Sequence, residues 1–431
     1  MIDFGSPILE FERNGIFQLK LRNPMDKSTT VSKSKMKVSG NRWPVDQMRI
    51  LHETLSIPTA PFAEHKVLAF VEQFCAVCKG VSVSRDQAGN LLARVRIGSR
   101  KVARPVCITA HLDHPGFVAD RMVGKNQVRA FWRGGVPKEY FVGASVRFAI
   151  DHSEATPLGP PLVRGEALRW AKGRIESIKT VKRDGVERVD TALIDVREDI
   201  PPGTIGMWDF PDPVIRGSKI FSRGCDDLAG AAAMLCAIDG LSREGKACDA
   251  YFLFTRAEEV GFVGAITAAR AKTIPKKCFV VAMETSSERP FAKMGDGPIL
   301  RVGDKASTFT HAVTAHCHLV AKDLAARDKT FKFQRKLMDG GTCESSAYCT
   351  LGYEATGLCV ALGNYHNVNA KRKKLGPEYI DLDDFAGAVK WFVALARSPL
   401  RYTGRDTALD NQMTTLEKCY AKLLAQSVPR P

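Results

Sequence analysis

Two adjacent glutamates, Glu258 and Glu259, follow an apolar run in the segment FTRAEEVG. The run before them, AYFLF, predicts a buried strand, and VGAITAARAK after them predicts the start of a helix. Neighbouring side chains of a strand point to opposite faces, and two carboxylates in a dry site repel each other. The pair therefore indicates that each glutamate has its own chemical role at the end of this strand.

Other imidazoles and carboxylates occupy the same kind of position, at the end of a predicted strand or in the turn before a helix. In open α/β sheets, ligands bind beyond the carboxyl ends of the strands, so we expect these side chains to meet at one edge of a sheet. The candidates are His111 and Asp113 after PVCITA, Asp226 and Asp227 before LAGAAAML, Glu284 in VVAMET and His366 after CVALG.

Histidines and carboxylates without cysteine suit a divalent ion such as Zn²⁺, with Co²⁺ and Mn²⁺ as alternatives. The number of acids predicts two ions, because one carboxylate can bridge metals about 3.5–4 Å apart. Taken singly, each residue also has an ordinary explanation: His111 as a buried histidine, Asp226 as a helix N-cap, or Glu259 as a surface charge. The joint pattern favours the metal site.

The elements around these residues predict an α/β fold. Residues 1–42 predict a flexible, basic N-terminal extension. In residues 43–120 and 223–431, helical and strand-like runs alternate, which predicts a mixed, mostly parallel sheet flanked by helices. Residues 121–222 consist of short β-rich runs between glycine and proline breaks, which predicts a small barrel-like domain inserted into the α/β domain.

Composition sets limits on localisation and partners. No apolar stretch of this 431-residue chain approaches the ~20 residues that a membrane span needs, so we expect no membrane partner. The segment MIDFGSPILEFERNG lacks the pattern of a secretory signal, which favours a cytoplasmic protein. The net charge is +16, but the basic clusters are not interleaved with stacking aromatics, so nucleic-acid binding is not expected.

Two further groups of residues have simple structural explanations. Cys75 and Cys78 form a Cys-x-x-Cys pair, but no second pair follows at zinc-finger spacing, which favours ordinary packing. His311, His316 and His318 lie in a predicted helix, and His316 and His318 do not share a helical face. We therefore assign neither group to the metal site.

The ordered set His-x-Asp, Asp-Asp, Glu-Glu, a carboxylate and His resembles the co-catalytic metallo-aminopeptidases, in particular the glutamyl-aminopeptidase and tetrahedral-aminopeptidase family. The resemblance runs from about Trp43 to Ala396 and includes GNLLARV, the β-rich insertion and the DGGTCESSAY turn. It implies a role for each matching residue. These are His111 and Glu284 on one metal, Glu259 and His366 on the other, Asp226 bridging both before a cis peptide bond, Asp113 orienting His111, and Glu258 as general base.

The resemblance implies an aminopeptidase that removes N-terminal residues from short peptides and forms a homo-oligomer. Two alternatives remain open: a related two-metal deacylase or carboxypeptidase, and a non-catalytic peptide-binding protein on the same fold. Retention of every ligand and of Glu258 argues against the second alternative.

The chain departs from the family pattern at positions close to the predicted ligands, which leaves specificity open. The departures are Glu284 where aspartate is common, His114 where an acid is frequent, Cys343 and Glu344 where Asp-Ala is usual, and Asn367 where serine usually follows the last histidine.

Overall fold

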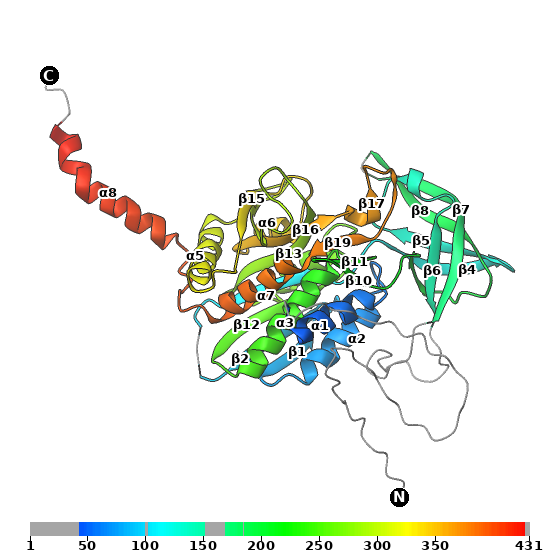
Figure 1. The fold of residues 1–431 in the computed structure, drawn as a ribbon, viewed down its shortest axis with the longest axis horizontal. Helices are drawn as coiled ribbons and strands as arrows, with labels where there is room; N and C mark the ends of the chain where they lie inside the picture. The colour runs from blue at the N-terminus through cyan, green and yellow to red at the C-terminus, as the bar shows by residue number, and fades with distance from the viewer. Residues whose placement is uncertain (1–42, 100–101, 151–168, 184, 427–431) are drawn as a thin grey trace, which may run out of the picture.

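The computed structural model describes residues 43–99, 102–150, 169–183 and 185–426, so the predicted extension of residues 1–42 lies outside the described residues. An eleven-stranded mixed sheet with helices on its faces forms the larger part, and a closed six-stranded barrel lies at one end of it (Figure 1). The predicted fold class is confirmed.

Four parallel strands form the centre of the sheet, and antiparallel strands extend it on both sides. β14 (Ile299–Gly303) also pairs with β16, and β15 (Gln334–Leu337) pairs with β14. In spatial order, the strands of the main path are β1 (Val81–Arg85), β2 (Leu91–Ile97), β12 (Cys248–Thr255), β3 (Val106–His111), β13 (Phe279–Ser287), β16 (Ala355–Gly363), β19 (Glu378–Asp381), β11 (Lys219–Ser222) and β10 (Val214–Arg216).

Both faces of the central strands are buried, because alternate side chains of each strand pack against helices on opposite sides. On β3, Ile108 and Ala110 face the larger core, whereas Cys107 faces the smaller one. The helices over the larger core are α1 (Val45–Ser56), α2 (His65–Ala76), α3 (Leu228–Glu244), α5 (His311–Arg327) and α7 (Leu382–Arg397), and those over the smaller core are α4 (Val263–Ala271) and α6 (Glu344–Thr350).

Helix α3 leads from the predicted ligand Asp226 into the core. Its first half, LAGAAAML, is fully buried, and its small side chains allow the helix to lie close to the sheet. Asp227 caps it, since the carboxylate accepts the backbone N–H of Gly230 at 3.2 Å. A Cβ at Gly230 would lie only 2.2 Å from that carboxylate, so the cap requires glycine there.

The barrel is closed around an aromatic core in which Phe117, Trp132 and Phe141 pack against one another. Strands β10 and β11 fall within the range 121–222 but pair with the large sheet, through contacts such as Ile220 with Ile380. The barrel strands are β4 (Gly116–Gly124), β5 (Gln127–Arg133), β6 (Ser145–Ile150), β7 (Arg169–Arg183), β8 (Val186–Val196) and β9 (Ile205–Trp208).

Among the residues that the structure describes, no helix is both long enough and apolar enough to cross a membrane. All twelve cysteines are free, including Cys75 and Cys78. The remaining elements of the fold are short or peripheral: the 3₁₀ turns η1 (Lys138–Tyr140) and η2 (Tyr365–Asn367), the hairpin of β17 (Val368–Asn369) and β18 (Lys374–Leu375), and the C-terminal helix α8 (Thr407–Gln426).

Candidate active site

The predicted ligands lie together at the carboxyl ends of the central parallel strands. His111 is the last residue of β3 and pairs in register with Thr255, the last residue of β12, which places Glu258 and Glu259 just beyond the sheet edge. Glu284 lies on β13, and His366 follows β16. Asp226 precedes α3, and the Asp226–Asp227 peptide bond is cis, as the resemblance implied.

His111 is held in one tautomer by the backbone. Its Nδ1 lies 3.0 Å from the carbonyl oxygen of Asp113, and because a carbonyl can only accept, Nδ1 carries the hydrogen. The Nε2 lone pair then faces carboxylates: Asp226 Oδ1 and Glu284 Oε1 each lie 3.5 Å away, and Glu258 Oε2 lies 3.9 Å away.

His366 has the same arrangement, with a partner from the barrel. Its Nδ1 donates to the carbonyl oxygen of Gly135 at 2.9 Å. Its Nε2 lies 3.1 Å from Glu259 Oε2 and 3.7 Å from Asp226 Oδ2. Asp226 therefore presents one carboxylate oxygen to each histidine.

This donor set fits bound cations. An imidazole lone pair and carboxylate oxygens repel one another unless a positive charge lies between them. Within the described residues, His366 Nε2, Asp226 Oδ1 and Glu259 Oε1 are buried without a hydrogen-bond partner. Ligand atoms lie within 4.8 Å of one another in three overlapping groups: His111, Glu258 and Glu259; His111, Asp227 and Glu284; and Asp226, Glu259 and His366. Asp227 was a candidate from its position before a helix, but the resemblance gave it no metal to bind.

The electrostatics of the cluster also favour positive charge. Burial raises the pKa of Glu284 to about 8, and the neighbouring Asp226 charge adds to this. Burial likewise raises the pKa of Glu258 well above its usual range. Burial alone would lower the pKa of His366, but the Glu259 and Asp226 carboxylates outweigh it and raise that pKa to about 10.

Asp113 contacts the two glutamates rather than filling the cavity. Its Oδ1 accepts the backbone N–H of Glu258 at 2.9 Å, and its Oδ2 accepts that of Glu259 at 3.0 Å. The nearer of its carboxylate oxygens lies 3.6 Å from His111 Nδ1, so the ring is oriented mainly by the Asp113 backbone carbonyl. The Asp113 carboxylate instead fixes the turn that carries both glutamates.

Glu378 has a comparable position on the other side of the site and was not predicted from the sequence. Its Oε2 accepts the backbone N–H of Cys225 at 2.7 Å and of Asp226 at 3.0 Å, and its Oε1 accepts that of His366 at 2.8 Å. One buried carboxylate thus joins two ligand-bearing segments. The segment GPEYIDL offers no spacing that could have revealed this role, because the contacts are backbone contacts across the fold.

Two of the departures from the family pattern contact each other. His114 Nδ1 lies 2.6 Å from the carbonyl oxygen of Asp226, and its Nε2 lies 3.1 Å from Asn367 Oδ1. Asn367 Nδ2 donates to the carbonyl oxygen of Arg223 at 2.7 Å. His114 is therefore a buried link between segments of the site.

The departures in GGTCESS point away from the cavity. Gly340, Gly341 and Thr342 line it, whereas Glu344 is buried beneath the sheet edge and accepts a hydrogen bond from Thr109 at 3.1 Å. Cys343 is also buried. The unusual pair therefore alters the packing below the site rather than the lining of the cavity.

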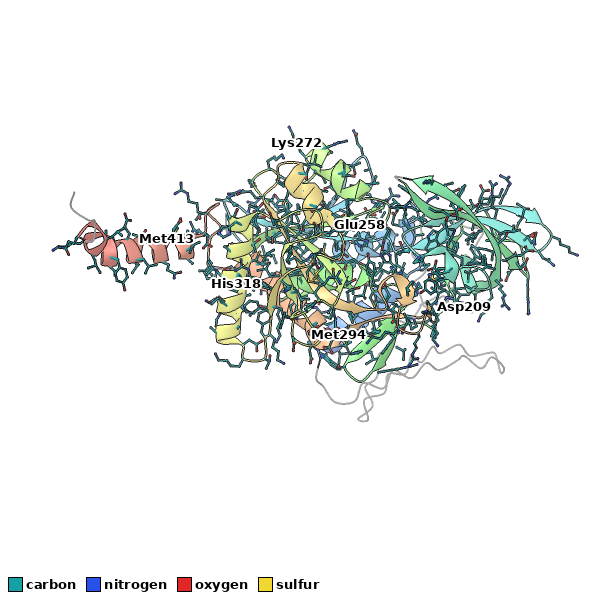
Figure 2. The ribbon with its side chains drawn as sticks, turned by 90° about the horizontal axis from the view of Figure 1, so that it is seen from above. Asp209, Glu258, Lys272, Met294, His318 and Met413 are labelled. Carbon is teal, nitrogen blue, oxygen red and sulfur yellow. The ribbon has the colours of Figure 1, made fainter. Side chains whose placement is uncertain are left out.

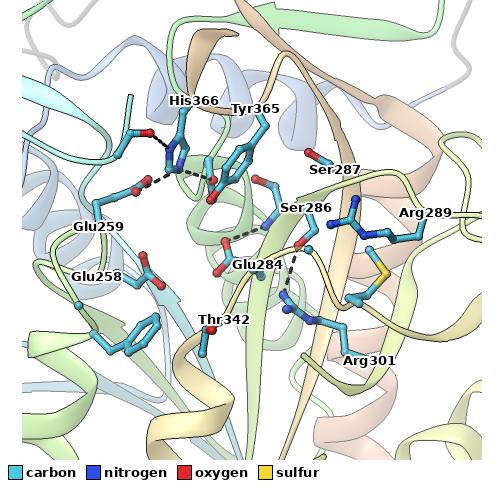
Figure 3. A pocket seen from close by; sticks show the side chains of 18 residues that line it. Glu258, Glu259, Glu284, Ser286, Ser287, Arg289, Arg301, Thr342, Tyr365 and His366 are labelled. Carbon is cyan, nitrogen blue, oxygen red and sulfur yellow. Dashed lines mark hydrogen bonds and ion pairs between the residues drawn. The ribbon is translucent and has the colours of Figure 1, made fainter. Parts of the chain in front are cut away.

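A cavity of about 250 Å³ opens over the cluster. Figure 3 shows Glu258 and Glu259 on one side of it and Arg289 and Arg301 on the other. Arg301 is 2% exposed and donates to Ser286 Oγ at 3.2 Å, and its Nε has no hydrogen-bond partner among the described residues. The cavity therefore combines a donor set that fits cations with a buried guanidinium that suits a carboxylate.

Comparison with known proteins agrees with this geometry. Residues 89–371, well over half of the chain, match the family model described as M42 glutamyl aminopeptidase. The chain is 25% identical over 276 residues to a curated protein of Acetivibrio thermocellus named "Putative aminopeptidase", which covers 62% of this chain and 76% of that protein.

Solved structures show the same fold. An aminopeptidase from the archaeon Desulfurococcus kamchatkensis matches with a TM-score of 0.63 at 22% identity, over 81% of this chain and 94% of that one. The TET1 peptidase of Pyrococcus horikoshii, described as assembling into a tetrahedron or a large octahedral shell, matches with a TM-score of 0.63 at 19% identity, over 82% of this chain and 99% of that one. With its ordered cluster of histidines and carboxylates and its family match, the chain belongs to the M42 glutamyl aminopeptidase family and is a peptide hydrolase.

Proposed function

We propose that the protein is a two-metal aminopeptidase that removes N-terminal residues from short peptides. The observation that carries this proposal is the position of Asp226, which presents one carboxylate oxygen to the Nε2 atom of each histidine. The Nε2 lone pairs of His111 and His366 converge on the two carboxylate oxygens of Asp226. A cation on each side of Asp226 would relieve the repulsion between these atoms.

The proposed ligands divide into two sets that share Asp226. His111 and Glu284 hold one ion, and Glu259 and His366 hold the other. Zn²⁺ is the proposed metal, with Co²⁺ and Mn²⁺ as alternatives, because the donors are imidazoles and carboxylates without thiolates. The metal dependence of the family supports this assignment.

When bound, the ions would lower the pKa of a water molecule and polarise the peptide carbonyl. Glu258 is the proposed general base: it takes a proton from the attacking water and delivers it to the leaving amine. Asp113 keeps Glu258 and Glu259 in their separate orientations, because its two carboxylate oxygens hold the backbone N–H groups of both. This is why two adjacent carboxylates can serve two different roles.

The size of the cavity and the buried Arg301 support a preference for short peptides with an acidic N-terminal residue. The Arg301 guanidinium would bind the side-chain carboxylate of that N-terminal residue in a water-poor site, where such a pairing is strong. A homo-oligomeric assembly and a cytoplasmic location belong to the same proposal. The assembly is supported by solved relatives described as a dodecamer and as a tetrahedron.

Mass spectrometry of peptides incubated with the Zn²⁺-loaded protein tests the function. Each peptide is supplied free and N-acetylated, with and without chelator. We expect N-terminal residues to be released from the free peptides alone, and chelator to abolish the release. Cleavage of acetylated peptides would favour the deacylase, release from the C-terminus would favour the carboxypeptidase, and no cleavage would favour peptide binding alone.

A further inference from the structure

The C-terminal helix α8 extends away from the α/β domain. Figures 1 and 2 show it projecting from the end of the molecule opposite the barrel, with Met413 well clear of the other elements. It is fixed at its base, where Asp406 Oδ2 lies 3.2 Å from His311 Nε2 and Asp406 Oδ1 accepts the backbone N–H of Leu409 at 3.1 Å. The helix lies beyond residues 89–371, which match the family, so the catalytic function does not account for it.

One face of α8 carries a regular apolar stripe. Its members are spaced alternately by four and three residues, and each residue is 40–63% exposed to solvent. A repeat that averages 3.5 residues is the spacing of a coiled-coil seam, in which side chains of one helix insert between those of another. The stripe consists of Leu409, Met413, Leu416, Tyr420 and Leu423.

The helix needs a partner on physical grounds. In proteins, most helical stability comes from packing of an apolar face rather than from intrinsic helix propensity. Threonines at 407, 414 and 415 weaken its intrinsic helix propensity further. An exposed row of large apolar side chains is also a recognised mark of an interaction surface.

The residues beside the stripe suit a second copy of the same helix in parallel orientation. In a parallel pair, Gln412 faces Glu417 of the partner subunit, and Cys419 faces Leu424 of the partner subunit, so no like charges meet. An antiparallel pair would bring the row of Asp410 and Glu417 against its own copy, and like charges there are unfavourable.

A membrane surface is a poorer match for this helix. Helices that lie in the membrane interface carry many lysines and arginines on the polar face. The polar face of α8 instead carries Lys418 and Lys422 against Asp410 and Glu417. We infer that α8 joins two copies of the chain as a parallel, in-register two-stranded coiled coil.

Cysteine cross-linking of the full-length protein tests this inference without reference to catalysis. The background variant is Cys419→Ser, because Cys419 is the exposed cysteine of the chain. Leu409→Cys, Leu416→Cys and Leu423→Cys are introduced singly into it. Their matched controls are Ala408→Cys, Thr415→Cys and Lys422→Cys, each one residue earlier on the outer face of the helix. Mild oxidation and non-reducing electrophoresis then measure the dimer.

We expect all three leucine positions to form disulfide-linked dimers at least about tenfold faster than their controls. Positions 409 and 423 lie about 21 Å apart along the helix, so only parallel, in-register pairing brings both next to their own copies. Cross-linking at 416 alone, equal rates at seam and control positions, or no cross-linking at any seam position would each overturn the proposal.

Discussion

His114 Nε2 lies 3.1 Å from Asn367 Oδ1, and through this contact two departures from the family pattern meet beside the site. His114 follows His111 by three residues, and Asn367 directly follows His366. The contact therefore joins the segment that carries one histidine to the segment that carries the other. A serine side chain at position 367 would be too short to make the same contact.

A double-mutant cycle measures this link. His114→Ala and Asn367→Ala are each expected to lower the free energy of unfolding, because each leaves a buried polar partner unpaired. The combined loss should be smaller than the sum of the single losses by about 0.5–3 kcal/mol. Pairing Asn367→Ala with His311→Ala, whose ring contacts Asp406 instead, should give nearly additive losses. Additivity in both cycles would mean that the contact has no energetic weight.

Glu258→Gln tests the proposed general base. The substitution keeps the size of the side chain but removes its ability to take a proton, so kcat should fall by about 10²- to 10⁴-fold. Zn²⁺ binding should be largely kept, whereas Glu259→Gln, one residue further on, should weaken it. A Glu258→Gln protein with native kcat would show that another group accepts the proton.

Glu378→Gln tests a positioning role. An amide cannot accept at both ends, so at least one of the three backbone N–H groups that Glu378 holds loses its acceptor. We expect the free energy of unfolding to fall by about 1–3 kcal/mol and the affinity for Zn²⁺ to fall about 10- to 100-fold. Glu354→Gln, at a carboxylate that contacts Tyr402, is the control. Loss of stability with unchanged Zn²⁺ affinity would assign Glu378 to the scaffold alone.

Arg301→Met tests the substrate preference. Methionine keeps much of the apolar volume and removes the guanidinium, so kcat/KM for a peptide with N-terminal glutamate should fall about 10- to 100-fold. A peptide with N-terminal leucine should be cleaved with little change. The control is Arg289→Met, because Arg289 is more exposed and lies 3.0 Å from Asp339. An equal loss for both peptides would show that Arg301 supports the site without selecting the substrate.

The sequence predicts those parts of the site that depend on local pattern. His111, Glu259 and His366 could be found because each follows an apolar strand, and parallel strands bring their carboxyl ends to one sheet edge. The general fold could be predicted for the same reason, since alternating helical and strand periodicity is a local property.

Features that depend on distant pairing could not be predicted. Strand β11 joins the large sheet because Ile220 pairs with Ile380, and nothing near residue 220 indicates that partner. Glu378 and Arg301 are ordinary charged residues in sequence and acquire their positions only when separate strands come together. The contact of the Asp113 carboxylate with the Glu258 and Glu259 backbone likewise depends on two loops that meet in space.

Calorimetric titration of the chelator-treated protein with Zn²⁺ is the most direct test of the metal centre. We expect two equivalents per chain in the native protein. His366→Ala should lose the ion held with Glu259 and retain binding at His111 and Glu284. A single equivalent in the native protein, or two equivalents unaffected by His366→Ala, would contradict the assignment of Asp226 as a bridge between two ions.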